Sequence, residues 1–161
     1  MNRLILVVVG GVALTVLVVA SSALFVVSQT QQALVLQFGN PIRVEREAGL
    51  KFKMPFVQDV TYYDNRILDL DPPAQEVILS DQKRINVDAF ARFRIVDALE
   101  FRRRAVTLSN FRQVFGGQLN SAIRSEVAKV GLQDMLTGKR VEVMDRIRDV
   151  VAKEAPAFGV E

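Results

Sequence analysis

The 161-residue chain contains no cysteine and no histidine. The missing cysteines exclude a disulfide framework, a thiolate zinc site and a cysteine nucleophile. The missing histidines exclude the side chain that most often acts as a general base near neutral pH or as a metal ligand. A lack of cysteine is compatible with any compartment, so it does not locate the protein. Together the two absences remove most common enzyme chemistries.

Charge is also scarce at the N-terminal end, where Arg3 is the only charged side chain before Arg43. Without Arg3, the rest of the chain has 20 basic and 18 acidic residues, so its net charge is only +2. Nucleic-acid binding usually requires a clustered basic face with stacking aromatic residues, which this balance does not indicate. The remainder of the chain suits a water-soluble domain.

Residues 4–27 form an uncharged, largely apolar run of 24 residues. A helix of that length reaches about 36 Å, which exceeds the hydrocarbon core of a bilayer at about 30 Å. We therefore predict that residues 1–28 are a signal anchor with one transmembrane helix. The predicted membrane-spanning side chains include Leu4, Val8, Val12, Val16, Val19, Leu24 and Val27.

A cleaved signal peptide is the alternative for this run, because Ser21-Ser22-Ala23 is an acceptable cleavage site with small residues. The apolar part of such a peptide is usually about 7–15 residues long, and here it continues past that site, which favours an uncleaved anchor. Because Arg3 precedes the run and no basic residue follows until Arg43, the positive-inside rule predicts a cytoplasmic N-terminus and an exported domain.

Residues 29–161 are predicted to form one α+β domain in which antiparallel strands come first and helices follow. In INVDAFARFRIV, residues 85–96, apolar and polar side chains alternate and only Phe90 breaks the pattern. This period of two indicates a strand with one face on a core and the other in water. Similar patterns predict further strands at residues 33–38, 42–44, 50–54, 67–70 and 75–79, with a Gly-Asn-Pro turn at 39–41.

The second half contains two apolar stripes with the spacing of amphipathic helices. Ser109 is the predicted N-cap of the first helix. Gly116 and Gly117 lie inside its stripe, which predicts either a break or a close packing contact. Pro156 and Gly159 end the second helix. The first stripe is Phe111, Phe115, Leu119, Ile123, Val127 and Val130, and the second is Val141, Met144, Ile147, Val150 and Val151.

The segment Ser80-Asp81-Gln82-Lys83 matches S-x-x-K, the serine–lysine signature of penicillin-recognising enzymes. In those enzymes the motif opens a helix, and the lysine can take the hydroxyl proton. Here it lies between two predicted strands, where Ser and Asp commonly form turns. We interpret it as a turn.

The other charged residues show no spacing typical of a metal site or an acid/base pair. Glu45 and Glu47 lie close together, and Asp69 and Asp71 lie at a strand end. The basic run 102–104 could contact phosphates or lipid headgroups, although such runs are more often solvated helix faces. We therefore predict no catalytic, cofactor or metal site, and no enzyme activity.

The segment GLKFKMPF, residues 49–56, allows two interpretations. Its apolar side chains share one face of an extended segment and its lysines share the other: Leu50, Phe52, Met54 and Phe56 against Lys51 and Lys53. The segment is either a core strand or a membrane-surface contact next to the anchor, with the lysines reaching lipid headgroups.

The segments GLKFKMPFVQDV, INVDAFARFRIVDALEF and LNSAIRSEVAKVGLQDMLTGKR follow the apolar run in that order. This order closely resembles the stomatin/prohibitin/flotillin/HflK-C (SPFH, band 7) family through nearly the whole chain, and within it the HflC branch. The resemblance implies a non-catalytic scaffold of the bacterial inner membrane with a periplasmic SPFH domain and no cofactor. It also implies hetero-oligomeric assembly with an HflK-like paralogue and control of an FtsH-like membrane protease.

A rival function on the same fold is that of a stomatin-like lipid-organising or channel-modulating protein without a protease partner. Family members continue past FGVE with a further strand and a long helix rich in Ala, Glu and Arg, which builds the wall of a cage. The 161 residues stop at Glu161. The resemblance therefore predicts that this 161-residue form inserts into the membrane without building a closed cage.

Overall fold

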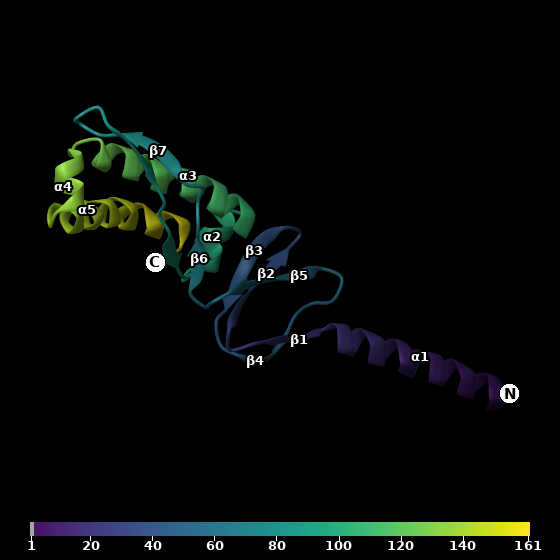
Figure 1. Cartoon of the computed structure of the whole chain (residues 1–161). Helices are drawn as coiled ribbons and strands as arrows, with labels where there is room; N and C mark the ends of the chain where they lie inside the picture. Colours follow the sequence, from purple (N-terminus) through teal and green to yellow (C-terminus); the bar gives the residue numbers. More distant parts are fainter. Residues whose placement is uncertain (1) are drawn as a thin grey trace. The chain divides into compact units, whose positions relative to one another are not determined.

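A computed structural model describes residues 2–161, which divide into two compact units, Met1–Asn65 and Arg66–Glu161 (Figure 1). Residue 1 lies outside the described part, as do the side chains at positions 2–6, 8, 9, 12, 13 and 15 of the N-terminal helix. The predicted membrane-spanning residues Leu4, Val8 and Val12 are among them.

The first unit begins with helix α1, Asn2–Ser22, which contains no acidic residue in its first turn and no basic residue in its last. Val16 and Val19 lie on this helix and are exposed. The helix ends at two serines, whose hydroxyl groups donate hydrogen bonds to carbonyl oxygens three residues earlier, at 2.8 and 2.9 Å. Among the residues that the structure describes, no helix is both long enough and apolar enough to cross a membrane.

The prediction that Leu24 and Val27 belong to the helix is wrong, because they lie in strand β1, Leu24–Val27. This strand pairs with β4, Gly49–Phe52, in an antiparallel two-stranded sheet. Exposed and buried side chains alternate along β1, as the period of a strand requires. One uninterrupted apolar run thus supplies both a helix and a strand, and hydropathy alone does not reveal the boundary.

A second, three-stranded sheet has the order β3-β2-β5, formed by Asn40–Glu45, Gln31–Gln37 and Gln58–Asp64. Strands β2 and β3 are joined by Phe38 and Gly39, which both have positive φ, 50° and 84°. Two such residues are typical of a type I′ hairpin turn, so the turn begins one residue earlier than predicted. The core of the unit comprises Phe25, Val27, Ala33 and Val35, with Val60 packed against them.

The strands of the second unit form two antiparallel pairs. Strand β6, Leu68–Leu70, pairs with β9, Ala91–Phe93, and β7, Gln75–Ile78, pairs with β8, Arg84–Val87. The single strand predicted over residues 85–96 is therefore two short strands with different partners. Its predicted alternation is confirmed, since the odd-numbered positions from 85 to 95 are buried or half-buried and the even-numbered positions are exposed.

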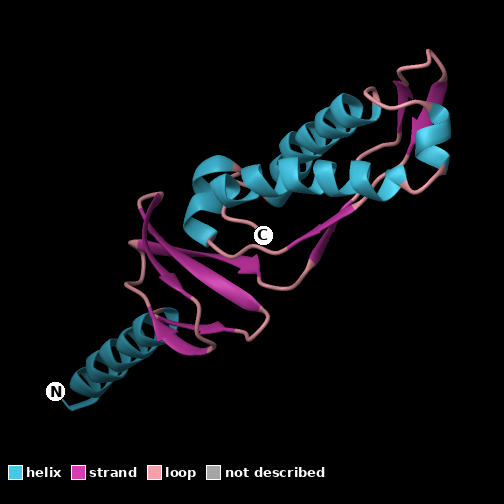
Figure 2. Cartoon of the chain, turned by 90° about the vertical axis from the view of Figure 1, so that its left-hand side faces the viewer, coloured by secondary structure: helices cyan, strands magenta, loops and turns pink. Residues whose placement is uncertain are grey.

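Helices follow the strands, as predicted: α2 (Ala98–Arg104), α3 (Leu108–Val127), α4 (Leu132–Leu136), α5 (Lys139–Glu154) and the 3₁₀ helix η1 (Ala155–Phe158) (Figure 2). Thr107, and not Ser109, caps α3, because its hydroxyl oxygen accepts a hydrogen bond from the Asn110 N–H at 3.2 Å. Helix α3 continues unbroken through Gly116 and Gly117. Gly116 is buried, and a Cβ atom there would meet Cβ of Pro72 at 3.4 Å, an ordinary packing contact, whereas a Cβ atom at Gly117 would meet nothing within 4 Å.

Aromatic rings dominate the core of the second unit. Phe111 is fully buried, and its ring contacts those of four other phenylalanines with centroid distances of 4.7 to 5.9 Å. These four are Phe93, Phe101, Phe115 and Phe158. Gly159 closes the chain against α2 with φ of 68°, where an added Cβ would meet the Asp97 carbonyl oxygen at 2.4 Å. The fold class is α+β, with antiparallel strands and amphipathic helices.

Candidate functional site

The apolar side chains of residues 49–56 point into solvent. The exposed fractions are 64% for Leu50, 58% for Phe52, 54% for Met54 and 88% for Phe56. A core strand would bury these side chains, so the core-strand interpretation of this segment is wrong. Strand β4 pairs only with β1 among the described strands. Such an edge position suits Pro55, which follows β4, because proline lacks an N–H to donate to a neighbouring strand and is confined to edge strands or loops.

Strand β1 extends this exposed apolar face. Leu24 lies opposite Phe52 and Val26 lies opposite Leu50, and directly opposed residues of antiparallel strands point to the same face. Both β1 side chains are exposed. We call the combined set the β1–β4 surface: Leu24, Val26, Leu50, Phe52, Met54 and Phe56. The sequence interpretation missed the β1 half because it assigned those residues to the helix.

The β1–β4 surface follows the apolar helix α1 directly in the chain. Only Ala23 separates the end of α1 from β1. The Ala23 carbonyl oxygen accepts a hydrogen bond from the Lys53 N–H at 2.7 Å, which fastens the end of β4 to the end of the helix. Anything that α1 binds, whether a membrane or a protein, therefore also lies close to the β1–β4 surface.

Charged side chains occupy the opposite side of β4. Lys51 pairs with Glu45 at 3.2 Å and with Glu47 at 3.8 Å. Glu45 also pairs with Arg43 at 3.4 Å, and the Arg43 guanidinium donates a hydrogen bond to the Phe52 carbonyl oxygen. These contacts commit the Lys51 ammonium to carboxylates of its own unit. Of the two lysines predicted to reach lipid headgroups, Lys51 is therefore already paired within the protein.

The loop after β4 holds Phe56 in an unfavourable backbone conformation. Its φ is 67°, which is uncommon for a residue other than glycine. The loop is closed by Gln58, whose side-chain oxygen accepts from the Met54 N–H at 2.8 Å and whose N–H donates to the Met54 carbonyl at 3.1 Å. Such strain persists only where surrounding contacts enforce it. The effect here is to present the Phe56 ring to solvent.

The S-x-x-K segment forms the turn between β7 and β8, as the sequence predicts. The Lys83 ammonium pairs with the Asp81 carboxylate at 3.4 Å, and the Leu132 N–H donates to the same oxygen at 3.3 Å. Partial desolvation raises the pKa of Asp81. Hydrogen bonds from the Leu132 and Lys83 N–H groups and the charge of Lys83 outweigh this effect and lower the pKa below its ordinary value. Lys83 therefore forms an ion pair with the carboxylate of Asp81 in this turn.

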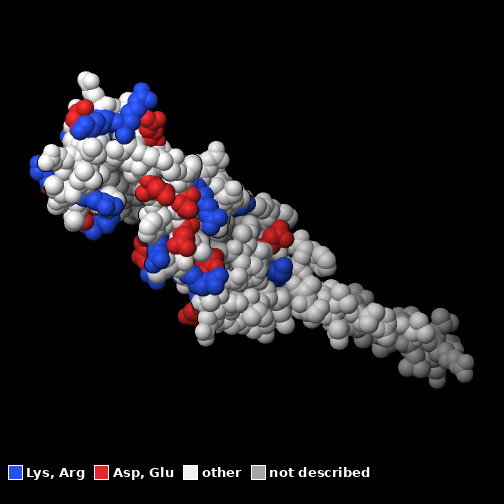
Figure 3. All heavy atoms as spheres, in the orientation of Figure 1, with Lys and Arg blue, Asp and Glu red and all other residues white. Residues whose placement is uncertain are grey.

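The remaining charged residues form ordinary surface pairs. Asp69 pairs with Arg92 at 3.4 Å, and Glu100 pairs with Arg103 of the basic run on α2 at 2.9 Å. In the visible face of the second unit, acidic and basic side chains are interspersed (Figure 3). Among residues 2–161, no group of three or more acidic side chains is placed to hold a metal ion. The β1–β4 surface is therefore the candidate site that stands out in the first unit.

A comparison with protein-family models identifies the domain. The model described as "SPFH domain / Band 7 family" matches residues 25–161, from within β1 to the last residue. The chain belongs to the SPFH domain / Band 7 family. The resemblance deduced from the sequence is confirmed, and the matched SPFH domain includes all of the β1–β4 surface except Leu24.

Curated relatives carry HflC names. "Modulator of FtsH protease HflC" of Escherichia coli (strain K12) is 27% identical over 144 residues, covering 84% of this chain and 43% of the relative. "Protein HflC" of Buchnera aphidicola subsp. Acyrthosiphon pisum is 28% identical over 134 residues, 76% and 42% of the two chains. "Protein HflC" of Treponema pallidum is 28% identical over 119 residues, 74% and 36%. The chain spans less than half the length of these relatives.

Proposed function

We propose that this protein is a non-catalytic membrane scaffold, an HflC-like subunit that modulates a membrane protease of the FtsH type together with an HflK-like paralogue. Membership of the SPFH / Band 7 family and the similarity to HflC proteins over most of the chain support this proposal. The name of the Escherichia coli relative states modulation of the FtsH protease. The proposal includes no catalytic residue and no cofactor.

The proposal places α1 in the bacterial inner membrane with the N-terminus in the cytoplasm and the SPFH domain in the periplasm. The support comes from the charge pattern, because Arg3 precedes an uncharged run and no basic residue follows until Arg43. With the helix ending at Ser22, residues 4–22 supply about 28 Å of apolar helix, close to the thickness of a hydrocarbon core.

The exposure of the β1–β4 surface is the main observation that supports a contact between this domain and the membrane. Six large apolar side chains lie exposed on one sheet face and the following loop, directly after α1. Exposed apolar patches on proteins mark contacts with other proteins or with membranes. We assign this patch to the outer leaflet beside the anchor, where lipid replaces water around its aromatic and aliphatic side chains. Because the anchor supplies proximity, even weak contacts hold the surface in place.

A second candidate is a lipid-organising or channel-modulating protein of the stomatin type, which the same apolar surface favours. The test is affinity purification of the tagged chain from bacterial membranes in a mild detergent, followed by mass spectrometry of proteins and lipids. An HflK-like protein and an FtsH-like protease in comparable amounts support the proposed function. Bound lipid or a channel with neither of those proteins supports the second candidate. The control is the same tag on an unrelated single-pass protein.

A further inference from the structure

The two most exposed large apolar side chains of the described residues lie at one end of the first unit's three-stranded sheet. Phe56 is 88% exposed and Phe38 is 80% exposed. Gln37, which precedes Phe38, lies opposite Gln58 in the register of β2 and β5. Gln58 also forms two hydrogen bonds with the Met54 backbone. The β2–β3 turn and the loop before β5 are therefore neighbours (Figure 1), and we call Phe38 and Phe56 the aromatic tip.

Both residues of the aromatic tip have a backbone conformation that bulky residues rarely adopt. Phe38 has φ of 50° and Phe56 has φ of 67°. The first central position of a type I′ turn normally holds asparagine, aspartate or glycine, and a phenylalanine there is an outlier. Packing does not explain this choice, because Phe38 is mostly exposed. Strained residues of this kind cluster at binding and switch sites, which favours a contact outside the chain.

A short series of contacts connects the end of α1 to the aromatic tip. The Lys53 N–H donates to the Ala23 carbonyl oxygen directly after α1, at 2.7 Å. Met54 follows, and Gln58 binds it and pairs with the strand that leads to Phe38. Given the membrane anchor proposed above, on which this inference rests, the tip lies near the surface of the bilayer. The tip thus extends the β1–β4 surface to the β2–β3 turn.

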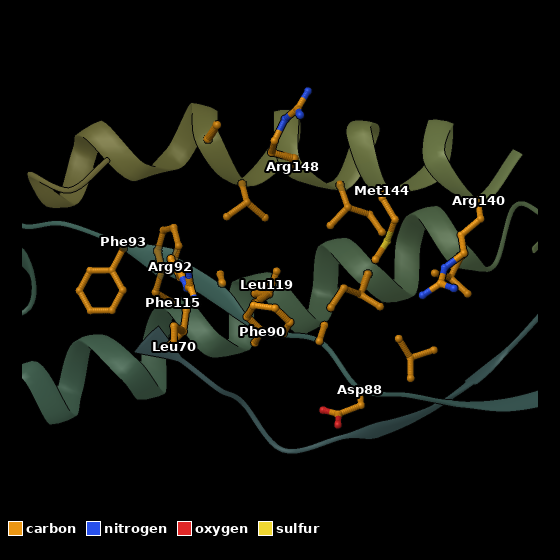
Figure 4. Close-up of a pocket in the computed structure, with 18 of the residues that line it drawn as sticks. Leu70, Asp88, Phe90, Arg92, Phe93, Phe115, Leu119, Arg140, Met144 and Arg148 are labelled. Atoms are coloured by element: carbon orange, nitrogen blue, oxygen red, sulfur yellow. The ribbon is translucent and has the colours of Figure 1, made fainter. Parts of the chain in front are cut away.

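The shape of the aromatic tip suits a bilayer better than a small ligand. Ligand sites are concave and bury most of the ligand, whereas Phe38 and Phe56 are mostly exposed to solvent. The second unit offers the contrast, since a groove of about 640 Å³ lies there between residues 85–93 and α5, and Met144 points into it (Figure 4). Glu161 lines that groove, so residues that follow it in a longer chain can fill the space. Two protruding rings are instead suited to insertion between lipids, as phenylalanine is in interfacial helices.

The charges of this unit provide little attraction to lipid headgroups of either sign. Residues 23–65 contain four basic and four acidic side chains and so carry no net charge: Arg43, Arg46, Lys51 and Lys53 against Glu45, Glu47, Asp59 and Asp64. Arg43 and Lys51 pair with carboxylates of the same unit. Lys53 is the basic residue closest in sequence to the tip, and it is partly buried. Membrane binding grows with buried apolar area and with attraction to anionic lipids, and here only the first contribution remains.

We propose that the aromatic tip inserts Phe38 and Phe56 between lipid acyl chains, and that it selects bilayers by their packing and not by their headgroup charge. Zwitterionic and anionic lipids fit equally well, provided that unsaturated chains leave space between neighbours for two rings. Saturated, tightly packed bilayers resist this insertion, because each ring has to displace ordered chains. Contact between the first unit and the membrane is then sensitive to lipid order and insensitive to salt, since salt screens only charges.

The test uses the full chain reconstituted in liposomes, with Phe38→Trp as the single tryptophan and a small fraction of each bilayer brominated in the acyl chain as quencher. Unsaturated phosphatidylcholine is the reference bilayer. In two further bilayers, phosphatidylglycerol replaces part of this lipid, or saturated chains replace the unsaturated ones. We expect strong quenching in both unsaturated bilayers at low and high salt, and much weaker quenching in the saturated one. Attraction by basic side chains would instead tighten contact with the anionic bilayer by roughly fivefold per side chain.

Variants separate the Phe38 ring from the turn that carries it. Phe38→Asn places a residue suited to positive φ in the turn, so the fold should be at least as stable in chemical denaturation. The same variant removes one ring, so lipid contact should weaken by roughly tenfold or more, measured as lower quenching of a reporter Phe56→Trp. Ile78→Asn is the matched control, since Ile78 is 54% exposed in the second unit, and Lys53→Gln removes the nearest lysine. Neither should change the quenching at position 56.

Several results would overturn the proposal. Quenching at position 38 that rises with anionic lipid and falls with salt would identify attraction by charge, and equal quenching in saturated and unsaturated bilayers would exclude selection by packing. Weak quenching at position 38 with strong quenching of Phe52→Trp would place the tip in water while the membrane contact proposed above holds; weak quenching at both positions would contradict that contact as well. Protection of position 38 from a water-soluble quencher, without quenching by brominated lipid, would reveal a protein occupant. A loss of stability in Phe38→Asn would assign the ring a structural role in the turn.

Discussion

Replacement of Phe52 by aspartate distinguishes an exposed β1–β4 surface from a buried one. Phe52 is 58% exposed, whereas Phe25 on the neighbouring strand is 7% exposed on the opposite face of the same two-stranded sheet. A charge at an exposed position changes stability by about 0.5 kcal/mol or less. A charge in the core lacks a partner and water, so Phe25→Asp should cost at least about 3 kcal/mol. The two variants therefore form a matched pair.

The same substitution should loosen contact with lipid. A phenylalanine presents about 200 Å², so the 58% that is exposed at position 52 corresponds to roughly 115 Å². Covering that area with lipid contributes up to about 3 kcal/mol at about 25 cal/mol per Å², and about half of that if the ring is half-covered. The contact should thus weaken by roughly tenfold or more, because about 1.4 kcal/mol corresponds to a factor of ten.

The assay is chemical denaturation followed by circular dichroism of residues 23–161 in buffer without detergent, so that no lipid-like contact contributes to stability, with the unsubstituted chain, Phe52→Asp and Phe25→Asp side by side. We expect nearly coincident curves for the first two and a large shift for the third. If Phe52→Asp unfolds the domain as readily as Phe25→Asp, then Phe52 is a core residue, and the assignment of a surface site to this sheet is refuted.

Three further predictions concern topology, the turn and the core. A reporter that is active only outside the cytoplasm should be active when fused after Glu161, and activity of a cytoplasmic reporter there instead would reverse the proposed orientation. Ser80→Ala and Lys83→Met should leave function intact and change stability by about 0.5 kcal/mol; loss of an activity without unfolding would contradict the turn assignment. Phe111→Ala should cost about 3–5 kcal/mol in denaturation experiments because it opens a cavity among packed rings, and a cost below about 1 kcal/mol would show that the rings do not form one core.

Much of the fold is predictable because its patterns are local. The alternation over residues 85–96 correctly identifies which side chains are buried, and the helical stripes mark α3 and α5. Strand partners depend on contacts distant in sequence, so the division between β8 and β9 is not visible in the pattern. Thr107 and Ser109 are both good N-cap residues, and only the backbone geometry shows which of them begins the helix.

The sequence predicts the part of the candidate site on β4 and the following loop, but not the part on β1. The alternation of Leu50, Phe52 and Met54 shows an apolar face, and one face with this pattern can be covered by either protein or lipid. Exposure in the folded chain distinguishes these cases. The contribution of Leu24 and Val26 is hidden because apolar residues of a strand and of a membrane helix have the same hydropathy. The role of Lys51 cannot be predicted from the sequence either, since its ion pair with Glu45 requires the end of β3 to lie close to β4, which belongs to a different sheet.

Depth-dependent quenching of a tryptophan at position 52 tests most directly whether the β1–β4 surface contacts the bilayer. The chain has no natural tryptophan, so Phe52→Trp introduces a single tryptophan whose emission can be excited selectively over that of the two tyrosines, and Phe101→Trp at a fully buried position provides the control. Both are reconstituted with lipids brominated at shallow positions of the acyl chain. We predict strong quenching at position 52 and little at position 101. Equal, weak quenching of both, with the fold intact, would contradict the proposed membrane contact.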